Sequence, residues 1–101
     1  MTQPQLAPWQ VALEKGAPVL LKDASSIRES IMADGALSMK VKTLTTMLCD
    51  ALLTHSDGVA SIANRARAMG ASEEEIAETL GVAFLMGGLP ALVTGSNAFR
   101  D

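Results

Sequence analysis

The sequence predicts an all-helical fold, a compact bundle of about six helices. Apolar residues recur at steps of three and four along most of the chain, and no segment has the convincing period-two alternation of a strand. Glycine, proline and serine stand where helices would begin and end. Hydrophobic residues make up 49% of the 101 residues, but aromatic ones only 3%. The core is therefore expected to consist of aliphatic and methionine side chains, packed closely through small residues.

A chain of 101 residues is expected to form one domain, covering residues 1–101. Residues 1–8, with two prolines and two glutamines, are predicted to be a loose N-terminal arm. The apolar content is high for a chain of this length, and self-association would hide the surplus. The composition therefore favours a homo-oligomer.

Two helices are predicted in the first third of the chain. The first covers residues 8–15 and the second residues 17–32, and each has a proline in its first turn, where the missing N–H is not needed. Gly16 and Gly35 suit their ends, because glycine readily closes a helix with a positive φ.

Two further helices are expected around a break at residues 55–58. Ser38 caps the first, which runs to about Thr54. Its predicted buried stripe consists of Val41, Leu44, Leu48, Ala51 and Leu52. The predicted buried face of the second consists of Val59, Ile62, Ala63, Ala66 and Met69.

The next helix has the clearest boundaries. Ser72 and Glu75 form a capping box that predicts its start. From Leu80 onward it is apolar on every side, so residues 80–86 are expected to serve both the core of the subunit and a contact between subunits. It should end at residues 87–88, and Pro90 should begin the last helix, which runs to about residue 100.

Composition also excludes several classes of partner. The net charge is −3 and no basic stripe exists, so nucleic acid is not an expected partner. The longest apolar run, residues 80–93, is shorter than the roughly 18 residues of a membrane span. The single cysteine and an N-terminus without a signal-peptide pattern predict a cytoplasmic protein.

Few side chains offer chemistry. With one histidine and one cysteine, neither a metal site nor a bound cofactor is expected. Cys49 lies beside the predicted buried stripe, so a packed thiol is favoured over a redox-active one. His55 falls in a helix break, where it is either a solvated histidine or a general base.

Residues 34–97 as a whole resemble the carboxymuconolactone decarboxylase and alkylhydroperoxidase D family. The matching pieces are DGALS at 34–38, the helix at 40–53, MGASEEEIAE at 69–78 and GVAFLMGGLPALV at 81–93. The resemblance implies an all-helical, alkylhydroperoxidase D-like fold that assembles as a homo-trimer or homo-hexamer. It also implies descent from peroxidases or decarboxylases.

The residues that carry the family's chemistry differ here. The peroxidase branch uses Cys-x-x-Cys-x-x-x-His with a glutamate on the preceding helix. In the register set by Gly70, the cysteines fall on His55 and Gly58, the histidine on Ile62 and the glutamate on Thr43. The decarboxylase branch also tends to have a histidine where Ile62 stands.

Two hypotheses follow from this register. In the first, the chain is an oligomeric small-molecule-binding or structural member without thiol peroxidase activity, whose former site near these four positions could hold a small organic molecule. In the second, it is an enzyme of altered chemistry, of decarboxylase, lactone or residual peroxidase type. His55 would then be the base for a small carboxylated or lactone substrate that Thr43 or Ser56 orients. The sequence leaves open whether the protein is an enzyme.

Overall fold

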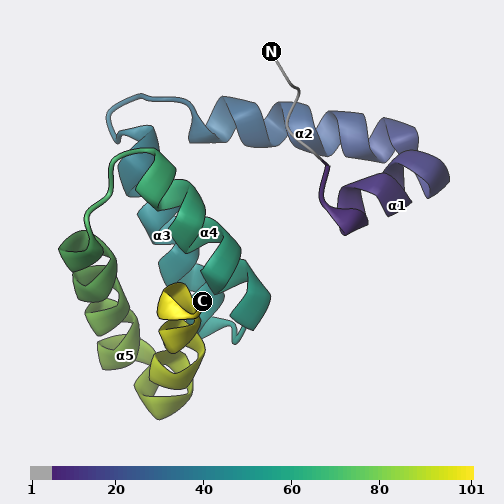
Figure 1. Cartoon of the computed structure of the whole chain (residues 1–101). Coiled ribbons are helices and arrows are strands. Elements are labelled where there is room, and N and C mark those ends of the chain that lie inside the picture. The colour runs from purple at the N-terminus through teal and green to yellow at the C-terminus, as the bar shows by residue number, and fades with distance from the viewer. Residues whose placement is uncertain (1–5) are drawn as a thin grey trace. The chain divides into compact units, whose positions relative to one another are not determined.

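The computed structural model describes residues 6–101, and all regular structure among them is helical (Figure 1). The elements are α1 (Pro8–Gly16), α2 (Pro18–Met32), α3 (Met39–Leu52), α4 (Ser56–Ala68), α5 (Glu73–Gly95) and the 3-10 helix η1 (Ser96–Phe99). The all-helical prediction is confirmed. The count of about six helices is not, because the described residues form five α-helices and one 3-10 turn.

The contacts divide the chain into two units, one up to Ala33 and one from Asp34 onward. The prediction of a single domain stays a prediction. Of the predicted N-terminal arm, residues 1–5 lie outside the described residues.

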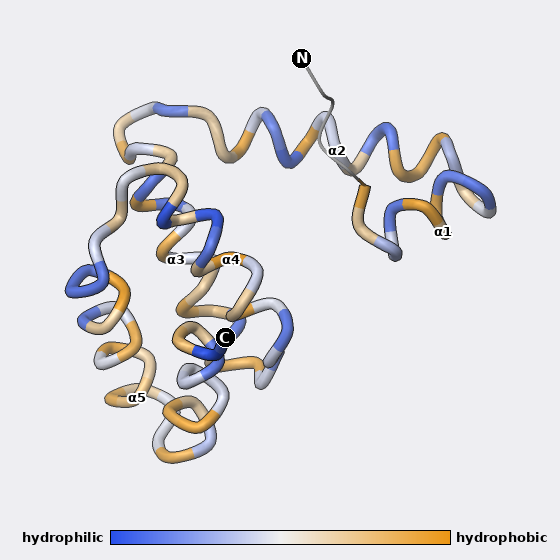
Figure 2. The backbone as a smooth tube through the Cα atoms, in the orientation of Figure 1, coloured by the Kyte–Doolittle hydropathy of each residue, from blue (hydrophilic) through white to orange (hydrophobic). Residues whose placement is uncertain are grey.

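The first unit is the helix pair α1 and α2. Each helix has proline in its first turn, as predicted, and the two helices contact each other. Neither helix contains a buried residue, so large apolar side chains such as Trp9, Leu20 and Ile27 remain exposed. Figure 2 shows apolar and polar positions alternating around both helices. Two helices without a fully buried side chain gain little stability from the hydrophobic effect.

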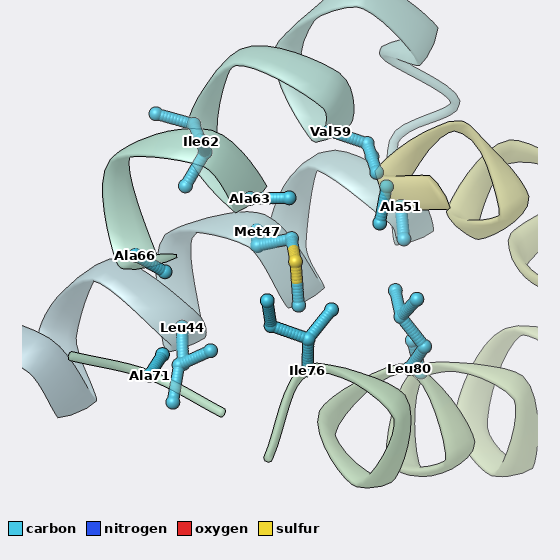
Figure 3. Close-up of a cluster of buried hydrophobic side chains, with 12 residues drawn as sticks. Leu44, Met47, Ala51, Val59, Ile62, Ala63, Ala66, Ala71, Ile76 and Leu80 are labelled. Atoms are coloured by element: carbon cyan, nitrogen blue, oxygen red, sulfur yellow. The ribbon is translucent and has the colours of Figure 1, made fainter. Parts of the chain in front are cut away.

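The second unit contains the core. In Figure 1, α3 and α4 lie side by side and α5 lies along α3. The side chains that fill the space between them are mostly small or unbranched, with Met47 and Ile76 at the centre (Figure 3). The predicted inward face of α4 is confirmed for Val59, Ile62, Ala63 and Ala66, which are all buried, whereas Met69 lies just past the end of the helix and is half-buried.

The predicted stripe of α3 is partly wrong. Leu44 and Ala51 are buried as expected, but Val41 and Leu52 are exposed. Thr43 and Met47 are fully buried instead. The reason is that α3 packs against both α4 and α5, so its inward face is wide and includes a polar residue.

The capping box at the start of α5 is present. The Oγ of Ser72 accepts the N–H of Glu75 at 3.0 Å, and Oε1 of Glu75 accepts the N–H of Ser72 at 2.9 Å. The second carboxylate oxygen of Glu75 lies 2.9 Å from Nζ of Lys40 on α3. The backbone hydrogen bond from Ser72, and then the Lys40 ammonium, lower the pKa of Glu75.

The expected break in α5 is at Gly88. This residue has φ of 72° and ψ of −160°, which is not helical and which glycine adopts without a Cβ clash. Figure 1 shows α5 reversing its course there. The second arm begins at Pro90 and, with η1, returns toward α4.

The apolar second half of the first arm is only partly buried within the chain, and its share in a contact between subunits stays a prediction. Ala83 faces the core, whereas Leu85 is 79% exposed and Met86 73% exposed. Leu80 is the last large residue of this arm that the neighbouring helices cover. Beyond it, Val82 and Phe84 are about half exposed, and the second arm buries only Ala91, Thr94 and Gly95.

By length and composition alone, Glu73–Phe99 would qualify as a membrane-crossing helix among the described residues. The turn at Gly88 divides it, and the first arm, residues 73–87, is about 22 Å long at 1.5 Å per residue. A bilayer's hydrocarbon layer is about 30 Å thick. The first arm alone is therefore shorter than this layer.

Candidate functional site

The candidate site lies at the sharp turn between α3 and α4. Thr54 has a positive φ of 62°, a conformation that a β-branched residue rarely adopts. The N–H of His55, the next residue, donates to the carbonyl of Asp50 at 2.8 Å. His55 is the N-cap residue of α4, but its side chain makes no capping hydrogen bond. The imidazole of His55 therefore does not accept a backbone N–H of the first turn of α4, as an N-cap side chain usually does.

The imidazole is paired with a carboxylate. Nδ1 of His55 lies 3.0 Å from Oδ1 of Asp50, which is in the last turn of α3. The His55 side chain is 58% exposed, whereas that of Asp50 is only 20% exposed. The carboxylate is therefore the more enclosed member of the pair.

Gly58 provides the space for that carboxylate. A Cβ atom at this position would lie 2.6 Å from Oδ2 and 2.9 Å from Cγ of Asp50. No side chain fits there unless the carboxylate moves. His55 and Gly58, which the sequence singled out as the two former cysteine positions, are thus joined through Asp50.

Sequence reasoning missed Asp50. Two signals could have indicated it: an acidic residue five positions before the histidine, across a predicted helix end, and a glycine in the first turn of the following helix. Glycine costs about 0.5–1 kcal/mol in a helix relative to alanine, so its presence often marks a close approach.

The other two predicted site positions lie in the core. Thr43 is fully buried, and its hydroxyl donates to the carbonyl of Met39 at 2.8 Å and lies 3.3 Å from the sulfur of Met69. Ile62 is buried beside Ala63 and Ala66 (Figure 3). Both side chains are therefore accounted for by packing, and the role predicted for them in a ligand pocket stays a prediction.

Cys49 is exposed, so the expectation of a packed thiol is wrong. It lies two residues from both Met47 and Ala51, which places it about 200° around the helix from each of those buried residues. Among residues 6–101, no three histidine, cysteine or acidic side chains converge as a metal site would require.

Arg67 forms a separate ionic cluster on the same unit. Its guanidinium makes two hydrogen bonds of 2.8 Å to the carboxylate of Glu73 and one of 2.9 Å to the carbonyl of Ala98. The paired hydrogen bonds raise the pKa of Arg67 and lower that of Glu73. This cluster ties α4 to the start of α5 and to η1, which is a structural role.

These features define a class of protein: an all-helical unit in which neighbouring helices α3 and α4 pack against a reversed α5, with a histidine–aspartate pair at the α3–α4 turn. The model of the carboxymuconolactone decarboxylase family matches residues 18–101, and the chain belongs to that family.

The fold also matches a solved structure. The chain is similar to the apo form of a carboxymuconolactone decarboxylase family protein from Legionella pneumophila, with 31% identity and a TM-score of 0.82. The match covers 87% of this chain and 79% of that one. No curated protein matches at a significant level. The family resemblance read from the sequence is thereby confirmed.

Proposed function

We propose that this chain is an oligomeric, small-molecule-binding or structural member of its family without thiol peroxidase activity. The observation that carries the proposal is the arrangement at the α3–α4 turn. The two positions that match the family's cysteines hold His55 and Gly58, and the carboxylate of Asp50 lies against both.

The chemistry of peroxide reduction supports this. A thiolate must attack the peroxide oxygen, and a second thiol must then resolve the sulfenic acid. The chain has one cysteine, Cys49, and it is located on α3, six residues before the first former cysteine position. A resolving thiol within the chain is lacking.

A peroxidase assay tests this proposal. The purified protein is incubated with an alkyl hydroperoxide and a dithiol reductant, and peroxide loss is compared with that caused by the reductant alone. We expect no difference. Robust turnover that disappears in Cys49→Ser would overturn the proposal.

The proposed assembly is a homo-trimer or homo-hexamer. It is supported by the exposed apolar side chains of α5, among them Val82, Leu85, Met86 and Leu89. Exposed large apolar side chains that lie close together in the sequence favour a protein contact. Light scattering at micromolar concentration tests it, and a strict monomer would contradict it.

A second candidate function is an enzyme in which His55 acts as a general base toward a small carboxylated or lactone substrate. The 3.0 Å contact between Nδ1 of His55 and Asp50 favours it, because a carboxylate commonly orients a catalytic imidazole. The test is a screen of such substrates with wild type and His55→Gln. Unchanged turnover of every accepted substrate would exclude this role.

We also propose that the protein acts in the cytoplasm without nucleic acid or membrane as a partner. The net charge of −3 and the free cysteine support this. Binding to anionic vesicles or to DNA at low salt would contradict it.

A further inference from the structure

In the Asp50–His55 pair, Nδ1 of the imidazole faces the carboxylate, and the second ring nitrogen, Nε2, has no role in that contact. A neutral imidazole carries its proton on one nitrogen and a lone pair on the other. A carboxylate only accepts hydrogen bonds, so the nitrogen that faces it must be the one with the proton. At 3.0 Å from Oδ1, Nδ1 of His55 is that nitrogen. The lone pair is then on Nε2, on a side chain that is 58% exposed.

We infer that Asp50 is a positioning residue that holds His55 as the Nδ1–H tautomer, and that Nε2 is the atom at which this site accepts a proton. The inference rests on the second candidate function and names its acceptor atom and its supporting residue. The substrate class is a small molecule with a weakly acidic C–H or O–H bond.

The proton-transfer step is balanced within the site. The lone pair of Nε2 forms the new N–H bond, and the electron pair of the broken C–H or O–H bond stays on the substrate as an anion. The imidazolium that results keeps its Nδ1–H bond toward Asp50. The adjacent carboxylate stabilises the positive charge without taking the proton itself.

Three features hold the pair in this geometry, two of which belong to the same helix-ending turn. The N–H of His55 donates to the backbone carbonyl of Asp50 at 2.8 Å, which fixes the two residues to each other through a second bond. Gly58 leaves room for Oδ2, where a Cβ would be 2.6 Å away. Thr54 holds a positive φ of 62° that places His55 after the turn. Such backbone strain persists where the surrounding structure enforces it.

Nitrogen-15 NMR of the imidazole tests the inference without any substrate. The chain has one histidine, so every imidazole signal belongs to His55. At a pH where the ring is neutral, we expect the Nδ1–H tautomer to dominate in the wild type. In Asp50→Ala, the ratio of Nδ1–H to Nε2–H should fall about fivefold, because a hydrogen bond to a charged group is lost.

Two further variants distinguish loss of the Asp50–His55 contact from general damage to the fold. Gly58→Ala keeps Asp50 but forces its carboxylate away from His55, so the ratio should fall here too, in a variant whose helix propensity is improved. Asp57→Ala removes a neighbouring carboxylate that pairs with Arg100, and it should leave the ratio unchanged.

A chemical probe gives a second readout of the acceptor atom. Diethyl pyrocarbonate reacts with the unprotonated ring nitrogen, so we expect Nε2 to be modified in the wild type. A wild type dominated by Nε2–H, modification at Nδ1, or ratios unchanged in both Asp50→Ala and Gly58→Ala would each overturn the inference. If the pairing is found but no candidate substrate is turned over, the proposed enzyme fails and the tautomer assignment stands.

Discussion

Thr43 is a buried polar residue at the position that the sequence resemblance matches to a glutamate of the family's peroxidase branch. Its hydroxyl reaches back to the carbonyl of Met39, one turn earlier on α3, and so needs no ligand to be satisfied. A glutamate here would place a carboxylate in a site that is 0% exposed. Burying an unpaired charge is costly, so the packing around Thr43 fits threonine and not the acidic residue of the relatives.

Replacing Thr43 with valine removes this hydrogen bond while nearly keeping the shape. We expect the free energy of unfolding to fall by about 1 kcal/mol, because the hydrogen bond from the buried Thr43 side chain to the Met39 carbonyl is lost. Urea denaturation monitored by circular dichroism measures it. Thr45→Val is the matched control: Thr45 also bonds a carbonyl one turn back, that of Val41, but it is exposed, so a change within about 0.5 kcal/mol is expected. Equal losses in both variants would show that burial of Thr43 has no consequence.

Local sequence signals predicted where the helices begin. The contacts between helices, which the sequence does not show, determine which side chains are buried and which are paired. Ser38 and Ser72 announce helix starts through side-chain bonds three residues away, and both bonds are present. The buried residues of α4 could be predicted from the sequence because its apolar residues form one regular stripe. The Asp50–His55 pair was missed because it depends on the turn at Thr54, whose positive φ no sequence pattern indicates. Cys49 was misplaced because the register of α3 differs from the predicted stripe.

The capping box at Ser72 should stabilise the start of α5. Ser72→Ala removes the oxygen that accepts the N–H of Glu75, and the free energy of unfolding should fall by about 1 kcal/mol. Ser72→Thr keeps a hydroxyl and should lose much less. Chemical denaturation of the three proteins at neutral pH measures the difference. A threonine variant as unstable as the alanine variant would contradict a capping role.

Acid should loosen the start of α5. Hydrogen bonds from Arg67 and from the Ser72 backbone lower the pKa values of Glu73 and Glu75 below the ordinary value of 4.5. Because the folded state lowers both values, their contribution to stability is present above that value and is lost as pH falls through the folded-state pKa. Urea midpoints measured from neutral pH downward should therefore decline below about pH 4.5.

Arg67→Leu provides the control for this pH dependence. It removes the partner of Glu73 but leaves the Ser72 and Lys40 contacts of Glu75. The variant should be less stable at neutral pH and should lose less on acidification than the wild type. An unchanged acid profile would mean that the Arg67–Glu73 pair does not contribute to it.

At the scale of the whole molecule, the chain has more apolar surface than it can cover. The pair α1 and α2 buries no residue, and α5 leaves large side chains exposed near its reversal at Gly88. The composition predicted this surplus. Of residues 80–86, which were expected to be shared by the core and a subunit contact, Leu80 and Ala83 are buried within the chain and the others are exposed. The buried residues of the second arm are Ala91, Thr94 and Gly95, none of which is large.

The last prediction concerns this exposed face of α5. Leu85 is 79% exposed, so Leu85→Glu should leave the fold of each chain intact, with a far-ultraviolet circular dichroism spectrum like that of the wild type. If the face is the contact between copies, burying the introduced charge is costly, and light scattering should show a shift toward the monomer. Ala77→Glu adds the same charge at an exposed position in the polar first half of α5 and should keep the wild-type mass. A Leu85→Glu protein with the wild-type mass would mean that copies associate through another surface. The exposed face of α5 would then need a different partner, because an apolar surface of this extent is unfavourable in water.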